Sequence, residues 1–173
     1  MKRLILMALV LGTAALEAQP VMVPTLQVCN FGNASGTANV YLSRRDDFNT
    51  AGTIDITVAD VGCDPNSSSP YPTGTISMRF HLSESSISDL QSTLIEQMTT
   101  FGKHTTTTIM NGRCTANGGT VPCHFWLMLV NNKVSSLDTP ADVVSVLVVD
   151  KNGIRLTYGT GPVKTGDISV TEY

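Results

Sequence analysis

Hard oxygen ligands gather in one polar stretch of the chain. Asp60, Asp64 and Asn66 stand near three consecutive serines, whose hydroxyls and backbone carbonyls add further oxygens. Such ligands suit calcium, but the EF-hand spacing is absent because no glutamate closes the loop. The simpler interpretation, which we favour, is that Asp64 and Asn66 initiate a turn by hydrogen bonding to their own backbone. We therefore expect no cofactor, with calcium as the alternative in this stretch, and assign no metal site.

An aromatic residue in the same stretch offers a binding surface. Tyr71 lies between two prolines, and the composition of residues 64–73 predicts an exposed loop. A flat ring with a polar edge suits contact with a carbohydrate or a protein. Tyr71, Asp60, Asp64 and Asn66 therefore form the candidate binding loop. Trp126, by contrast, is flanked by core-like residues and is expected to pack between sheets.

Three histidines, His81, His104 and His124, are the candidate acid–base groups. Nucleophilic catalysis requires a hydroxyl or thiol beside a base that a third group holds in place. The sequence contains no G-x-S-x-G turn, and Asp55 and Asp64 are interpreted as strand-face and turn residues rather than as facing carboxylates. No catalytic residue is assigned. A non-enzymatic protein is favoured, and the alternative is a small hydrolase that uses a histidine and an aspartate.

Four cysteines, Cys29, Cys63, Cys114 and Cys123, predict two disulfides. Of the three connectivities we favour Cys29–Cys63 and Cys114–Cys123, because each pair encloses a local strand–loop–strand segment. Each bridge would stabilise the fold by about 2–4 kcal/mol. Zinc binding by Cys114, Cys123 and His124 is disfavoured, since two of these residues are adjacent and no C-x-x-C spacing occurs.

The beginning of the chain resembles a secretory signal. Residues 1–18 combine a basic start, a short apolar core and small residues, and the cut is expected after Ala18 or after Ala15. The apolar run is too short to span a bilayer, so we expect a secreted or cell-surface product with no membrane span. The formal net charge is −3 and no basic cluster occurs, which argues against nucleic-acid binding.

Short alternating segments dominate the mature region, residues 19–173, and predict strands. Asn152-Gly153 is a strong hairpin signal of the I′ type, and the apolar run at 125–130 implies a central strand that is covered on both faces. Nine strands are predicted, at residues 21–31, 37–43, 53–61, 75–82, 105–110, 121–130, 143–150, 154–158 and 168–172.

One segment departs from this pattern. Apolar residues between 86 and 101 follow helical spacing, with a capping box at Ser88 and Gln91 and with Gly102 to end the helix. A helix over 86–101 is predicted, with a pair of strands as the alternative. The expected fold is mostly β: a single-domain antiparallel β-sandwich of about nine strands and one helix.

The C-terminal half resembles small β-sandwich accessory domains of exported bacterial proteins. The likeness covers residues 73–171 and rests on turn and strand motifs at 112–118, 125–132, 142–150 and 161–170. The segment 87–101 and Cys29 depart from that pattern. The resemblance implies a surface or accessory domain and supplies no catalytic residues.

These features favour a secreted, non-catalytic extracellular module that acts in adhesion, recognition or surface structure. Its expected partner is an extracellular protein or a glycan. Besides the hydrolase, a secreted inhibitor or effector that inserts the proline-rich loop is a further alternative.

Overall fold

A computed structural model describes residues 32–44, 47–63, 69–102, 105–132 and 141–172. Strands account for the regular structure of these residues, and no helix capable of crossing a membrane occurs among them. The described strands are β1 (Gly32–Arg44), β2 (Asp47–Gly62), β3 (Thr73–His81), β4 (Asp89–Phe101), β5 (Thr106–Ala116), β6 (Val121–Asn131), β7 (Val143–Asp150) and β8 (Arg155–Glu172).

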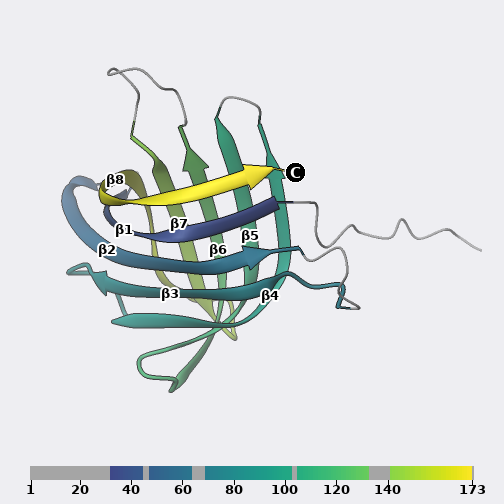
Figure 1. Ribbon diagram of the computed structural model, residues 1–173. Coiled ribbons are helices and arrows are strands. Elements are labelled where there is room, and N and C mark those ends of the chain that lie inside the picture. Colours follow the sequence, from purple (N-terminus) through teal and green to yellow (C-terminus); the bar gives the residue numbers. More distant parts are fainter. Residues whose placement is uncertain (1–31, 45–46, 64–68, 103–104, 133–140, 173) are drawn as a thin grey trace, which may run out of the picture.

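Each strand pairs antiparallel with the next, and β8 pairs with β1 to close a barrel. In Figure 1, β1, β2, β3 and the end of β8 form the front wall and run steeply across β5, β6 and β7 behind them. The inward-pointing residues of the strands fill the barrel with apolar side chains. The largest fully buried ones are Phe125, Leu42, Ile54, Ile56, Ile76, Met78, Leu90, Ile95, Met98, Met110, Leu127 and Leu129.

The predicted β-sandwich is wrong. Sandwich and barrel strands alternate in the same way, so the sequence pattern did not distinguish the two folds. The deciding feature is the long pairing between the first and last described strands, from Gly32↔Glu172 to Ser43↔Thr160. The strands predicted at 154–158 and 168–172 are the two ends of β8, which pairs first with β7 and then with β1. The strand predicted at 21–31 lies outside the described residues.

The predicted helix over 86–101 is also wrong, because residues 89–101 form β4. Two register shifts against β5, between Ser92 and Leu94 and between Ile95 and Gln97, interrupt the alternation of this strand. Each bulge inserts a residue, so the inward apolar positions become Leu90, Ile95 and Met98. The helix-like spacing of Ile87, Leu90, Leu94, Met98 and Phe101 does not form one buried face, since Leu94 is only partly buried and Phe101 is 47 % exposed.

The hairpin predicted at Asn152-Gly153 is present, but its turn is not of the I′ type. Among the described residues outside glycine, positive φ occurs only at Asp60 and Asn117, so Asn152 is excluded. Gly153 has φ +81° and donates its N–H to the Asp150 carbonyl. These two features identify Gly153 as the bulge residue of a three-residue hairpin loop. The Asp150 carboxylate accepts hydrogen bonds from the N–H groups of Asn152 and Ile154 and fixes the turn.

The strand predicted at 121–130 forms β6, which lies between β5 and β7 as expected for a central strand. Its predicted cover on both faces is wrong for the described part of the chain. Trp126 points outward and is 43 % exposed, so it does not pack between sheets. The inward residues Phe125, Leu127 and Leu129 are buried in the barrel.

Candidate functional site

A row of polar side chains crosses the outer side of four neighbouring strands, β1, β2, β3 and β4. The register places Asn39 of β1 opposite Asp55 of β2, Asp55 opposite Arg79 of β3, and Arg79 opposite Asp89 of β4. Both sequence neighbours of Asn39, Asp55 and Arg79 are buried in the barrel, so these three side chains point outward. Asp89 is the first residue of β4, and its neighbour Leu90 points inward. We call Asn39, Asp55, Arg79 and Asp89 the polar row.

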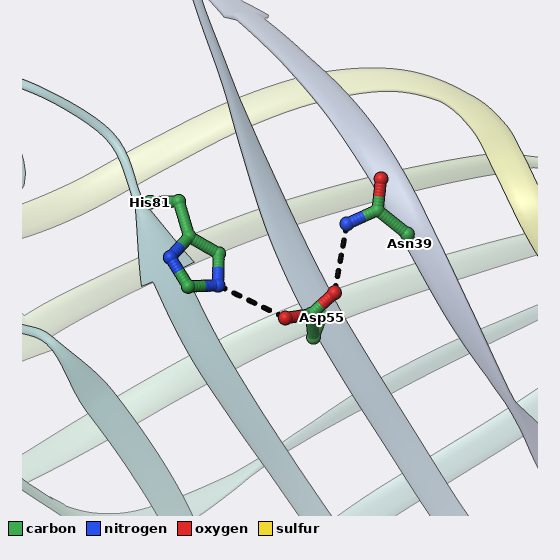
Figure 2. Close-up of polar contacts among 3 residues, drawn as sticks. All are labelled: Asn39, Asp55 and His81. Carbon is green, nitrogen blue, oxygen red and sulfur yellow. Dashed lines mark hydrogen bonds and ion pairs between the residues drawn. The ribbon is translucent and has the colours of Figure 1, made fainter.

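Two neighbours fix the carboxylate of Asp55 (Figure 2). The Asn39 side-chain amide donates a hydrogen bond to Oδ1 at 2.7 Å, and His81 Nε2 lies 2.9 Å from Oδ2. The bonds from Asn39 and His81, with the nearby Arg79 charge, hold the pKa of Asp55 below its ordinary value. All of these groups are largely exposed, so water screens the attraction between the charges.

The other end of the row is anchored to the hairpin between β5 and β6. Gly118 N–H donates to Asp89 Oδ1 at 2.9 Å, and the Ser88 hydroxyl donates to Oδ2 at 2.8 Å. These two bonds lower the pKa of Asp89. Ser88 N–H in turn donates to the side-chain oxygen of Asn117, at 2.8 Å. The carboxylate of Asp89 is therefore held in place by backbone on one side and by a hydroxyl on the other.

A groove of about 620 Å³ runs along this surface. It forms where β3 and β4 pair at only three positions, beginning at Ser77↔Gln91 and ending at Arg79↔Asp89. Beyond each end of this short ladder, the N–H groups of β3 find acceptors outside the regular pairing with β4. Ile76 N–H donates to the hydroxyl of Ser92, and Phe80 N–H donates to the carbonyl of Ser88. The groove is lined by Asp55, Thr57, Ser77, Met78, Arg79, Asp89, Leu90, Gln91 and Gly118.

Arg79 is the central cation of the groove, between the carboxylates of Asp55 and Asp89. Its guanidinium forms no hydrogen bond or ion pair with any described residue. With respect to the described part of the chain, all five of its N–H donors are available. Thr57, Ser77 and Gln91 form a second polar row directly alongside, opposite one another on β2, β3 and β4. The groove thus combines one free cation, two fixed carboxylates, hydroxyls and an amide.

Comparison of the chain with protein-family models, with curated proteins and with solved structures finds no match. The geometry of the chain's own residues therefore carries the functional argument.

Tyr71 and Asp60, the described members of the candidate binding loop, do not line this groove. Tyr71 is 43 % exposed, as predicted, and the Ser69 hydroxyl accepts a hydrogen bond from its N–H. Asp60 is exposed near the end of β2 and adopts positive φ. Asp64 and Asn66 lie outside the described residues, so the calcium site stays a prediction. Within the described ranges, no three His, Cys, Asp or Glu side chains come close enough together to hold a metal ion.

The structure separates the predicted histidines. His81 reaches the Asp55 carboxylate, but no described hydroxyl hydrogen-bonds to its ring. His124 lies on β6, opposite Arg113 and Val149, on the far wall of the barrel. His104 lies outside the described residues. The predicted hydrolase requires a histidine in contact with a carboxylate and a hydroxyl. The structure shows the contact between His81 and Asp55, but no hydroxyl of the described residues bonds to His81.

The predicted bridge between Cys114 and Cys123 is confirmed. The two residues lie directly opposite each other on β5 and β6, point inward and are buried. Because both sulfur atoms are joined in this disulfide, Cys114 and Cys123 do not form the zinc site that the sequence disfavours. Cys63 is also disulfide-bonded. Cys29 lies outside the described residues, so its pairing with Cys63 stays a prediction.

The polar row itself was missed by sequence reasoning. Asp55, Arg79 and His81 were visible as the polar positions of two alternating segments, but they were interpreted as an ordinary solvated face. The available signal was the recurrence of charged residues at equivalent places in consecutive strands. Using it requires the register between strands, which a single sequence does not supply.

Proposed function

We propose that this protein is an exported, non-catalytic recognition module that binds a polyhydroxylated ligand, such as a glycan, in the groove over β2, β3 and β4. The observation that carries the proposal is the free Arg79 guanidinium between the fixed carboxylates of Asp55 and Asp89. The volume of the groove, about 620 Å³, lies within the usual range of small-ligand sites.

The donors and acceptors of the groove suit hydroxyl groups. A sugar hydroxyl both donates and accepts, so it can donate to a carboxylate while it accepts from a guanidinium or an amide. Arg79 supplies donors, Asp55 and Asp89 supply acceptors, and Gln91 supplies both. Neighbouring hydroxyls of one ring could be held in this way by adjacent strands.

The charge arrangement argues against simple ions. An anion that approached Arg79 would also meet two carboxylates. Asp55 and Asp89 lie two strands apart, which corresponds to about 10 Å between their backbones. One cation cannot be coordinated by both, because calcium–oxygen distances are about 2.3–2.6 Å. A neutral ligand with several hydroxyls is not repelled by the two carboxylates, and it can contact each of them through a different hydroxyl.

Export is supported by the signal-like residues 1–18 and by the Cys114–Cys123 bridge, since disulfides persist mainly in oxidising compartments. A secreted or cell-surface location fits a protein that recognises glycans.

The test is binding of the oxidised protein to an array of neutral and acidic oligosaccharides, followed by calorimetric titration of the best ligand. We expect Arg79→Gln to weaken binding by roughly tenfold or more, because a charge-assisted hydrogen bond is lost. Asp167→Asn is the matched control, since it changes an exposed charge on β8 outside the groove. Absence of any glycan ligand, or equal binding by the two variants, would refute the proposal.

A further inference from the structure

The outer surface of the barrel continues from the groove across β1 toward β8. The register places Tyr41 of β1 opposite Thr53 of β2, so that Asp55, the next outward residue of β2, is its diagonal neighbour at about 7–8 Å. Both sequence neighbours of Tyr41 are buried, and its own side chain points outward and is 42 % exposed. An accessible aromatic ring thus stands just beyond the Asp55 end of the groove.

The two ends of the groove differ. At the β4 end the hairpin between β5 and β6 borders the groove, because Gly118 lines it and donates its N–H to Asp89. At the other end the lining residues, Asp55 and Thr57, lie on β2, and the sheet continues directly into β1. Figure 1 shows β1, β2 and β3 side by side on this wall, with the end of β8 next to β1. A ligand that is longer than the groove can therefore extend over β1.

Lys164 of β8 reaches over the Tyr41 ring. A register shift makes Lys164 an extra residue in its strand, since Val163 and Thr165 pair with consecutive residues of β1. Such a bulge redirects a side chain. The Lys164 ammonium lies 4.9 Å from the centre of the Tyr41 ring, within the range of a cation–π contact. This contact favours one orientation of the ring, and the ammonium forms no ion pair with a described carboxylate.

This aromatic and cationic pair suits a sugar ring. A sugar carries C–H groups on its faces and hydroxyls around its rim, so an aromatic ring can cover one face while a nearby ammonium donates to the hydroxyls. Because Lys164 already restrains Tyr41, less side-chain freedom is lost when the ring is covered.

We infer that Tyr41 and Lys164 form a second subsite and that the protein binds an oligosaccharide, with one unit in the groove and a further unit on Tyr41. This inference rests on the proposed binding of glycans by the groove. Arg79 and Tyr41 lie two strands apart, which is about 10 Å, and one outward position apart along the strands, which is about 7 Å. This separation exceeds the width of one sugar ring, so a single sugar beside Arg79 does not reach Tyr41.

The experiment is calorimetric titration of the oxidised protein with oligosaccharides of glucose, mannose, galactose and N-acetylglucosamine, each from the monosaccharide to the tetrasaccharide. We expect the affinity to rise roughly tenfold between the monosaccharide and the longer oligomers, because a further apolar ring face is buried. Tyr41→Ala should remove this gain. Tyr41→Phe should keep it, because the aromatic ring and its contact with the cation remain.

Tyr71→Ala is the matched control, because Tyr71 is similarly exposed, at 43 %, but lies outside the groove and precedes β3. It should keep the gain with length. Arg79→Gln should weaken the binding of every length by the same factor, since each length places one unit in the groove. Circular dichroism checks that the variants fold. Lys164→Gln tests the subsite from a second strand and should reduce the gain by roughly threefold, even if Tyr41→Ala does not fold.

The outcomes separate this inference from the proposed function. Affinity that depends on Arg79 but not on oligosaccharide length overturns the inference and leaves the proposed function standing. A gain with length that Tyr41→Ala retains, or that Tyr71→Ala removes, also overturns it. Absence of binding at every length refutes both proposals.

Discussion

The two carboxylates of the polar row should make stability depend on acid pH. Hydrogen bonds from Asn39 and His81 lower the pKa of Asp55, and bonds from Gly118 and Ser88 lower that of Asp89, both relative to 3.8. A carboxylate with a lowered folded-state pKa contributes its full stabilisation above the unfolded-state pKa and loses it as the pH falls through the folded-state pKa. The contribution should therefore be constant from pH 5 to pH 7 and decline progressively as the pH falls below about 4.

Urea unfolding at pH 6 and pH 3 checks this for Asp89→Asn. The variant should be less stable than the wild type at pH 6, by less than about 1 kcal/mol because the group is exposed, and the difference should shrink at pH 3. Asp167→Asn is the control, since no described residue hydrogen-bonds to the Asp167 side chain. A deficit of Asp89→Asn that is the same at both pH values would contradict the linkage.

The cysteines predicted a buried bridge of the barrel, whereas the residues of the groove were not predicted as a site. The disulfide of Cys114 and Cys123 was predicted from the short segment between the two cysteines and from the expectation of export, which favours disulfides. The polar row did not follow, although Asp55 and Arg79 were placed on strands. Their contact depends on a register that the connection between β2 and β3 and the bulge near Asp60 set together. The connection and the bulge depend on backbone conformation rather than on residue type.

At the scale of elements, the short ladder between β3 and β4 depends on one buried side chain. Ser92 is 8 % exposed, and its hydroxyl accepts the Ile76 N–H at 2.8 Å where no partner strand does so. Ser92→Ala leaves this N–H buried without an acceptor and should reduce the free energy of unfolding by about 1–3 kcal/mol. Thr93→Ala, at the adjacent exposed position, is the control. Equal urea midpoints for the two variants would exclude this role of Ser92.

The strands that were predicted best each carried a clear local signal. β3 was located by its period-2 alternation, β6 by its continuous apolar run and β7 by the hairpin signal that follows it, whereas only residues 105–110 of β5 were predicted. β4 failed because its bulges shift which residues point inward, and β8 failed because it was divided at the glycine-rich middle of one strand. Bulges and bends curve a sheet into a barrel. The bulges and bends that made β4 and β8 hard to predict are therefore the features that let the sheet close into a barrel.

At the scale of the whole molecule, barrel closure requires that β1 and β8 approach more closely than side chains normally permit. A Cβ at Gly161 would collide with the carbonyl oxygen of Tyr41, so Gly161→Ala forces the backbone of β1 away from β8. We expect a loss of about 1–3 kcal/mol in the free energy of unfolding, as for other overpacked sites. Thr165→Ala, exposed on the same strand, is the control and should lose little.

Amide hydrogen exchange shows which strand pairs Gly161→Ala destabilises. Because β1 and β8 also pair with β2 and β7, local opening should expose the amides between β1 and β8 while those between β5 and β6 stay protected. The Cys114–Cys123 bridge holds β5 and β6 together independently of this closure. Uniform loss of protection would mean that the barrel opens only as one cooperative unit. Unchanged stability of Gly161→Ala would mean that the close approach of β8 to β1 is not what closes the barrel.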